Sequence, residues 1–119
     1  MGRIAPEIFR KRLLIEGYFA RPTLDSGAIR EYFTLITGRL GLRTYGEPIV
    51  HATSGQGKAA NEGYDAFVPL IDSGIYVCVW SARRFASVIL YTCAEFEEDE
   101  AADATRGFFE LTRWETVLF

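Results

Sequence analysis

Apolar and polar residues alternate along several short stretches of this chain, and a period of two is typical of β-strands with one buried face. In two longer stretches the apolar residues recur three and four positions apart, which is the spacing of one helix face. The pattern predicts helices at 24–42 and 95–110. It predicts strands at 12–19, 42–52, 64–71, 75–80 and 85–92, with a final short strand within 113–119.

The first helix has the clearest limits. Asp25 or Ser26 can cap its N-terminus, because the side-chain oxygen of either residue can accept a hydrogen bond from a free backbone N–H. Gly41 can end the helix, since glycine readily takes the left-handed conformation that follows many helices. The second helix begins in an acidic run, residues 95–100, whose charges complement the helix dipole.

The predicted order of elements is β-α-β-β-β-β-α-β. Strands that follow one another in sequence usually pair, so we expect a mostly antiparallel sheet. Two helices on one face of that sheet would make an α+β two-layer sandwich. A length of 119 residues is typical of one domain, so residues 1–119 are predicted to form a single folded unit.

The stretch 72–93, DSGIYVCVWSARRFASVILYTC, is predicted to be a hairpin centred near Ala82. This register places Ser73 opposite Thr92 or Cys93, and Cys78 near Ser87. The two cysteines are then five or six residues apart along the strands, which is too far for a disulfide. Ser73 and Cys78 differ by five positions, so regular alternation puts their side chains on opposite faces of the sheet. A free cysteine is most often a small buried apolar residue, and this is the plain interpretation of both thiols.

Composition and charge exclude several classes of function. The net charge of −3 argues against a general nucleic-acid binder, which is usually basic. No apolar run approaches the ~20 residues that span a bilayer, and the start of the chain lacks the pattern of a secretory signal, so we expect no membrane partner and a cytoplasmic protein. Two cysteines and one histidine are few metal ligands, so no metal site is expected.

A glycine-rich stretch, residues 53–63, contains Gly-x-Gly-Lys and invites comparison with phosphate-binding loops. The Walker pattern requires Ser or Thr after the lysine and a helix after the loop. Here Ala59 follows Lys58 and a strand is predicted next, so a surface loop is the better interpretation. His51, the only histidine, lies in a predicted strand, where a lone histidine is more often structural than catalytic.

Asp72-Ser73-Gly74 separates two apolar runs, as turn residues commonly do. An internal cleavage site is the functional alternative. In such a site the serine hydroxyl attacks the preceding carbonyl carbon, and the resulting ester eliminates to leave an N-terminal pyruvoyl group. That carbonyl can form a Schiff base with an amine and withdraw electrons during decarboxylation.

The same hairpin resembles the small prokaryotic S-adenosylmethionine decarboxylases, which are pyruvoyl enzymes of polyamine (spermidine) synthesis. That family has a Glu-Ser-His cleavage step, then I-H-T-W-P-E, then an aromatic-Ala-x-[VI]-D-x-F-T-C-G strand. Here Asp72-Ser73-Gly74 falls at the cleavage step, Trp80 at the tryptophan, and FASVILYTC (85–93) at the second strand without a gap. Weaker likenesses are HATSGQG (51–57) to the H-x-F-x-P-Q-G segment and LLIEGY (13–18) to the first strand.

The resemblance implies an S-adenosylmethionine decarboxylase-like domain that cleaves itself between Asp72 and Ser73. Ser73 would become the pyruvoyl cofactor, and Cys93 would be the catalytic proton donor. Trp80, Thr53 and Glu16 would lie at the substrate site, which would take S-adenosylmethionine or a related amine. The family places its sites at a homodimer interface, so the resemblance also implies a homodimer.

Several positions depart from the family pattern. Cys78 stands where the family has the histidine that assists self-cleavage, and a thiol between Val77 and Val79 is expected to have a raised pKa. Asp72 replaces the glutamate, Gly74 the histidine of the cleavage step, and Thr53 the aromatic residue that packs on adenine. Three functions therefore stay open: an active decarboxylase, a non-processing homologue that acts as a regulatory or ligand-binding dimer, and an S-adenosylmethionine-dependent enzyme of different chemistry.

Overall fold

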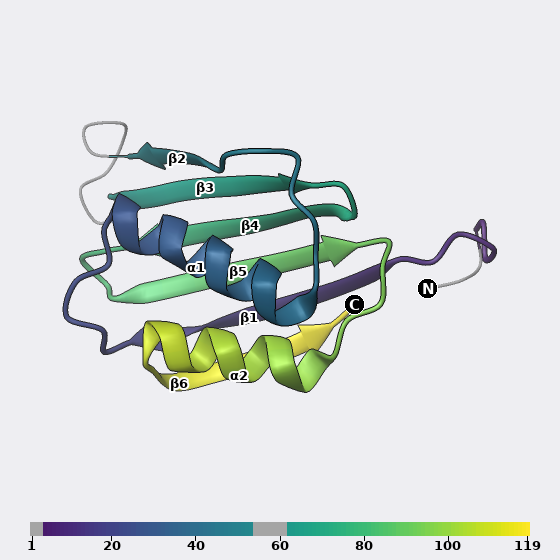
Figure 1. Ribbon diagram of the computed structural model, residues 1–119. Coiled ribbons are helices and arrows are strands. Elements are labelled where there is room, and N and C mark those ends of the chain that lie inside the picture. Colours follow the sequence, from purple (N-terminus) through teal and green to yellow (C-terminus); the bar gives the residue numbers. More distant parts are fainter. Residues whose placement is uncertain (1–3, 54–61) are drawn as a thin grey trace.

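The computed structural model describes residues 4–53 and 62–119, and Figure 1 shows its two helices lying over one face of a sheet. Side chains at alternate positions are buried in the strands 11–19, 63–70, 73–80 and 85–92, which gives each of these strands one buried face. The helices are α1 (Ser26–Leu40) and α2 (Glu98–Phe109). The strands are β1 (Lys11–Phe19), β2 (Ile49–Ala52), β3 (Gly63–Leu70), β4 (Ser73–Trp80), β5 (Phe85–Thr92) and β6 (Leu111–Leu118).

The described strands form one sheet of six, in the order β2-β3-β4-β5-β1-β6, and each neighbouring pair is antiparallel. With both helices on one side, this is the α+β two-layer sandwich that the sequence predicts. β1 is the exception to simple sequential pairing, because it lies between β5 and β6 rather than beside β2. Sequence neighbours therefore form a meander from β2 to β5, and the chain's first and last strands complete the sheet.

The core lies between the helices and the sheet. Tyr32 of α1 is fully buried, and this burial raises the pKa of its phenol. The Tyr32 hydroxyl and the Thr105 hydroxyl of α2 share a hydrogen bond of 2.7 Å, which satisfies the buried polar atom. The centroids of the Tyr32 and Phe109 rings are 4.8 Å apart, so the two rings pack against each other between α1 and α2. The predicted limits of α1 are confirmed: Asp25 accepts a hydrogen bond from the N–H of Ala28, and Gly41 is left-handed.

Several predicted elements differ from the structure in their limits. The second strand is confined to Ile49–Ala52, whereas residues 42–48 make only an isolated bridge from Thr44 to Leu70. Gly46 and Pro48 explain the difference, since both weaken a ladder. Because β2 is short, the end of β3 has no full strand beside it, and this is where Pro69 lies. Ser73 begins β4 rather than occupying the turn, and the helix α2 starts at Glu98, within the acidic run, rather than at Glu95.

The sheet face away from the helices is the open face of the molecule (Figure 1). Aromatic and aliphatic side chains on this face are partly exposed, including Tyr18, Phe67, Tyr76, Ile89 and Tyr91. Within the described part of the chain, no helix is long and apolar enough to cross a membrane.

Candidate functional site at the start of β4

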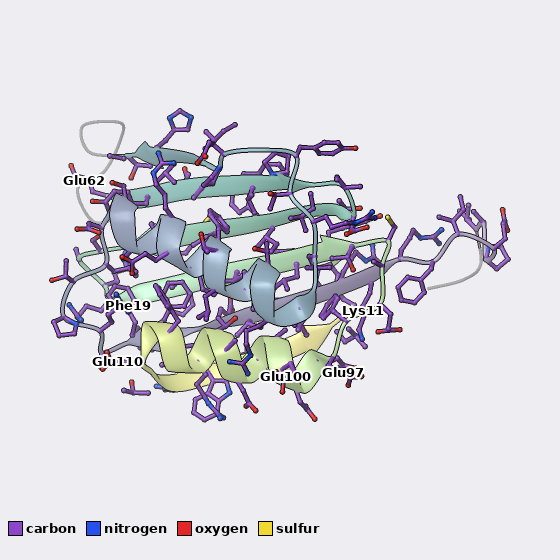
Figure 2. The ribbon with its side chains drawn as sticks, in the orientation of Figure 1. Lys11, Phe19, Glu62, Glu97, Glu100 and Glu110 are labelled. Atoms are coloured by element: carbon purple, nitrogen blue, oxygen red, sulfur yellow. The ribbon has the colours of Figure 1, made fainter. Side chains whose placement is uncertain are left out.

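The predicted cleavage step lies at one end of the sheet, where the chain turns from β3 into β4. Ser73 pairs with Leu70 of β3 and with Thr92 of β5, so the first of the two predicted partners is the observed one. Lys11 pairs with Thr92 from the other side, and Figure 2 labels it at this end of the sheet. Cys93 follows Thr92 directly, is exposed, and therefore lies beside the Asp72–Ser73 step.

Ser73 has an unusual backbone for a residue with a side chain. Its φ is 126°, in a region that glycine tolerates and that L-residues rarely adopt. Such a conformation costs about 1–3 kcal/mol and persists only where the surroundings hold it. The peptide bond on the N-terminal side of Ser73 is therefore held in a strained segment.

A backbone hydrogen bond holds the carbonyl of that peptide bond. The N–H of Cys93 donates to the carbonyl oxygen of Asp72 at 2.8 Å. A fixed N–H donor stabilises negative charge that develops on a carbonyl oxygen when a nucleophile adds to its carbon. The strained serine and the polarised carbonyl thus meet at one peptide bond.

An ion pair anchors Asp72. Arg43 Nη2 lies 2.9 Å from Asp72 Oδ1, and the backbone N–H of Arg43 donates to Oδ2 at 3.3 Å. Asp72 is only 6% exposed, and the hydrogen bonds from Arg43 lower the pKa of its carboxyl. The same bonds raise the pKa of the Arg43 guanidinium, to which Cys93 contributes a smaller electrostatic effect. Arg43 lies two residues beyond Gly41, and nothing in the sequence pattern marks it as part of this site.

Cys78 lies elsewhere, near the middle of the open face. It pairs with Ser87 of β5 and Asp65 of β3, and the predicted Cys78–Ser87 register is confirmed. Burial raises the pKa of the thiol to about 11, and a hydrogen bond to Asp65 adds to the effect, while one from Tyr76 opposes it. The raised pKa is as predicted. Its cause is the packing of the open face, since Val77 and Val79 are buried on the helix side.

A row of polar residues crosses the open face at the level of Cys78. Ser87 donates a hydrogen bond to Glu16 Oε1 at 3.0 Å, and Glu16 in turn pairs with Glu115 of β6. On the other side, Asp65 pairs with His51. A groove of about 240 Å³ runs along the Glu16 end of this row. Its lining consists of residues 16–18, Phe85 and residues 113–115.

Trp80 and Thr53 lie at the far end of the sheet from Ser73. Trp80 is the last residue of β4, seven positions from Ser73, or roughly 23 Å along the strand. Trp80 pairs with Gly63, and Gly63 donates its N–H to Thr53 Oγ1 at 2.8 Å. The Trp80 ring packs 5.6 Å from Phe85 beside a groove of about 300 Å³.

The structure thus brings Asp72, Ser73 and Cys93 together, and it places Cys78 and Glu16 on the open face and Trp80 with Thr53 at the opposite end. Both cysteines are free. Among residues 4–53 and 62–119, no three His, Cys, Asp or Glu side chains are placed to hold a metal ion. The predicted phosphate-loop comparison at residues 53–63 falls mostly on residues 54–61, outside the described residues.

A solved structure shares this arrangement of strands and helices. It is the crystal structure of the adenosylmethionine decarboxylase from Aquifex aeolicus VF5, with a TM-score of 0.75 and 18% sequence identity. The similarity covers 94% of this chain and 89% of that one. No protein-family model matches the chain, and no curated protein sequence matches it. At this identity the likeness establishes the fold: the chain has the α+β fold of that decarboxylase structure.

Proposed function

We propose that this chain is a pyruvoyl-dependent decarboxylase of S-adenosylmethionine or a related amine, and that it cleaves itself between Asp72 and Ser73. The observation that carries the proposal is the Asp72–Ser73 peptide bond itself. Its carbonyl oxygen accepts the Cys93 N–H at 2.8 Å, and its serine has a φ of 126°. Shared fold with a decarboxylase structure supports the class of enzyme.

The cleavage chemistry uses groups at this step. Ser73 Oγ adds to the carbonyl carbon of Asp72, and the C–N bond breaks to leave an ester and a free amine. The Cys93 N–H would stabilise the oxyanion during this shift. Elimination then removes the Cα proton of Ser73 and expels the Asp72 carboxylate. One water adds and one ammonia leaves, so the products are a chain ending at Asp72 and a chain beginning with a pyruvoyl group.

The residues at the step fit the pyruvoyl group, because Ser73 supplies its atoms and the adjoining carbonyl already has a donor. The group would supply an electron-accepting carbonyl for loss of carbon dioxide from an amino acid. The exposed Cys93 thiol would deliver a proton from Sγ to the substrate carbon that loses the carboxylate. Arg43 would keep Asp72, and with it the end of the cleaved strand, in place.

Glu16, Trp80 and Thr53 are proposed substrate contacts by resemblance. Their distance from Ser73 within one chain affects whether one copy of the chain can form the whole site. A site that used both ends of the sheet would need residues from two copies, which agrees with the proposed homodimer. The partly exposed apolar side chains of the open face are suited to such a contact.

Intact mass tests the proposal directly. The purified protein should run as two chains on a denaturing gel, and their masses should add up to that of the intact 13.4 kDa chain plus one water minus one ammonia. Ser73→Ala should give the single intact chain. A wild-type protein that stays uncleaved would sink the pyruvoyl mechanism. Borohydride trapping of the cleaved protein with S-adenosylmethionine, compared with other amines, would then identify the substrate.

A non-processing homologue is the second candidate, and the position of Cys78 favours it. Self-cleavage needs a group that accepts the Ser73 hydroxyl proton. Cys78 stands where the family has a histidine, but it lies on the sheet face opposite to Ser73, with a pKa of about 11. A thiol of that pKa is a poor base at neutral pH. An intact chain that binds S-adenosylmethionine without converting it would support this candidate.

A further inference from the structure

The outer edge of β6 is an unpaired strand edge, and it is longer than the edge on the opposite side of the sheet. β6 pairs with β1 on one side only, and each residue from Thr112 to Leu118 is exposed. The opposite edge strand, β2, has four residues against eight in β6. A long exposed edge presents free N–H and C=O groups that can pair with another strand.

Arg113 and Glu115 are the charged residues of β6, and other devices that protect a strand edge are few here. The strand contains neither proline nor lysine, and its one register shift lies near the start, opposite Tyr18 and Phe19. The helix α2 leaves the edge uncovered, since Trp114, Thr116 and Leu118 on the helix side of β6 are all exposed. Figure 1 shows β6 at the lower border of the sheet, partly behind α2 in this view.

The direction of the backbone groups can be read from β1. A Cβ on Gly17 would fall 2.4 Å from the carbonyl oxygen of Arg113, so that carbonyl points toward β1. The N–H of Phe119 also points toward β1, where it bonds the carbonyl of Arg12 at 3.0 Å. Because these directions alternate along a strand, Trp114 and Thr116 present their N–H and C=O groups to the outside.

The side chains around Trp114 have a self-complementary charge order. Arg113 and Glu115 flank it and share the open face, since they pair with Tyr18 and Glu16 of β1. In the described part of the chain neither forms an ion pair, and Glu115 lies opposite the like-charged Glu16. Trp114 is on the helix side, where the Arg106 guanidinium lies 4.8 Å from its ring.

We propose that two copies of this chain pair antiparallel along β6, with Trp114 of each opposite Trp114 of the other, so that their sheets join into one. The outward groups of Trp114 then bond across the two-fold axis. Each Arg113 then lies directly opposite Glu115 of the second copy. These two residues form a non-hydrogen-bonded pair of the antiparallel ladder, in which side chains are closest.

Only this register joins the outward groups and also matches the charges. Sliding one strand by two residues keeps the hydrogen bonds but places Glu115 opposite Glu115, or Arg113 opposite Arg113, and like charges directly opposite are unfavourable. Sliding by one residue sets the outward groups of Trp114 opposite Glu115, whose own N–H and C=O point back to β1, so these hydrogen bonds are lost. The contact uses only the outer edge of the open face, at Arg113 and Glu115, so the inference holds whether or not the proposed decarboxylase is active.

A cross-linking experiment tests the register. In a background of Cys78→Ser and Cys93→Ser, Trp114→Cys places two thiols in a hydrogen-bonded antiparallel pair with Cα atoms about 5.5 Å apart, within disulfide range. Mild oxidation should trap a covalent dimer. Arg113→Cys is the matched control, because its two thiols are offset along the strands and should cross-link at least tenfold more slowly. Equal rates, or no dimer from Trp114→Cys, would overturn the register.

Charge reversal tests the pairing itself. Arg113→Glu should weaken self-association by about tenfold or more, since two favourable pairs become two repulsive ones. Arg113→Glu combined with Glu115→Arg should restore association to near the wild-type value. Sedimentation equilibrium measures both, and far-ultraviolet circular dichroism checks the fold. A wild-type chain that stays monomeric, or a double variant as weak as the single one, would contradict the proposal.

Discussion

Cys78 and Cys93 lie on neighbouring strands of one hairpin, yet their surroundings differ in every respect that matters for chemistry. Cys93 is exposed just beyond β5, and its backbone N–H holds the Asp72 carbonyl. Cys78 is half-buried on the open face, between Asp65 and Ser87, with its pKa raised to about 11. A strand end leaves a thiol free to reach a substrate, whereas the middle of a strand fixes it among neighbours.

This difference separates the end of the hairpin that we propose to be reactive from its middle. The distinction comes from position along the strand, because Cys93 lies just beyond the end of β5 whereas Cys78 lies within β4. If the proposed chemistry is correct, perturbing the two thiols should have unequal consequences, and the inequality can be measured.

The largest effect is expected on turnover. Cys93→Ala should leave cleavage at Ser73 intact but lower the decarboxylation rate by about 10²–10⁴-fold, which is the usual contribution of a proton-transfer group. Cys78→Ala should change turnover far less, because its thiol lies on the other face from Ser73. Carbon dioxide release from S-adenosylmethionine, normalised to the cleaved fraction, measures both. A Cys93→Ala protein with unchanged turnover would remove this thiol from the mechanism.

Thiol labelling should show the next largest difference. Raising the pKa of Cys78 from 9.0 to about 11 lowers its thiolate fraction by about 100-fold at pH values below both. In a Cys93→Ser variant, Cys78 should therefore react with iodoacetamide about 100-fold more slowly in the native protein than in the urea-unfolded chain. The reciprocal Cys78→Ser variant reports the exposed Cys93, whose labelling should change much less on unfolding. Equal protection of the two thiols would contradict the comparison.

The Arg43–Asp72 ion pair should make the stability of the fold depend on pH in the acid range. Arg43 holds the pKa of Asp72 below 3.8, so the pair stabilises the fold above that pH, and the contribution is lost as pH falls through the lowered pKa. The stability difference between wild type and Arg43→Ala should thus shrink at acid pH. Urea unfolding over a pH series measures it, ideally in a Ser73→Ala background that cannot cleave.

Arg39→Ala is the matched control for that series. It removes an ion pair of similar length, 2.8 Å, between Arg39 and the exposed Glu100. Exposed pairs contribute little to stability, so this substitution should be nearly neutral. A pH dependence as large as that of Arg43→Ala would show that neither pair is special to the cleavage step.

The smallest effect concerns strain at the cleavage step. Ser73→Gly should be more stable than Ser73→Ala by about 1 kcal/mol, because glycine tolerates a φ of 126° and alanine does not. Neither variant has the hydroxyl, so both stay uncleaved and can be compared by urea unfolding. At Cys78, which lies on a regular strand, the order should be reversed. Cys78→Gly should be less stable than Cys78→Ala, since glycine weakens strand interiors.

Local pattern in the sequence was sufficient for much of this molecule. Alternation predicts β5 at 85–92, and the hairpin arithmetic gives the Cys78–Ser87 register, because a short connection fixes the pairing of adjacent strands. Capping chemistry gives the limits of α1 through Asp25 and Gly41. The α+β class follows from the order of elements, since adjacent strands tend to pair and helices cover one face.

Contacts between distant segments could not be predicted from local pattern. Pairing of β1 with β5 and β6, and the meeting of Arg43 with Asp72 across 29 positions, have no local signal, because they depend on how whole elements pack. The positive φ of Ser73 likewise reflects its place between Leu70 and Thr92 rather than a preference of serine. The family resemblance of the hairpin marked Ser73 and Cys93 as candidates, and the fold supplied the donor, the strain and the charge around them.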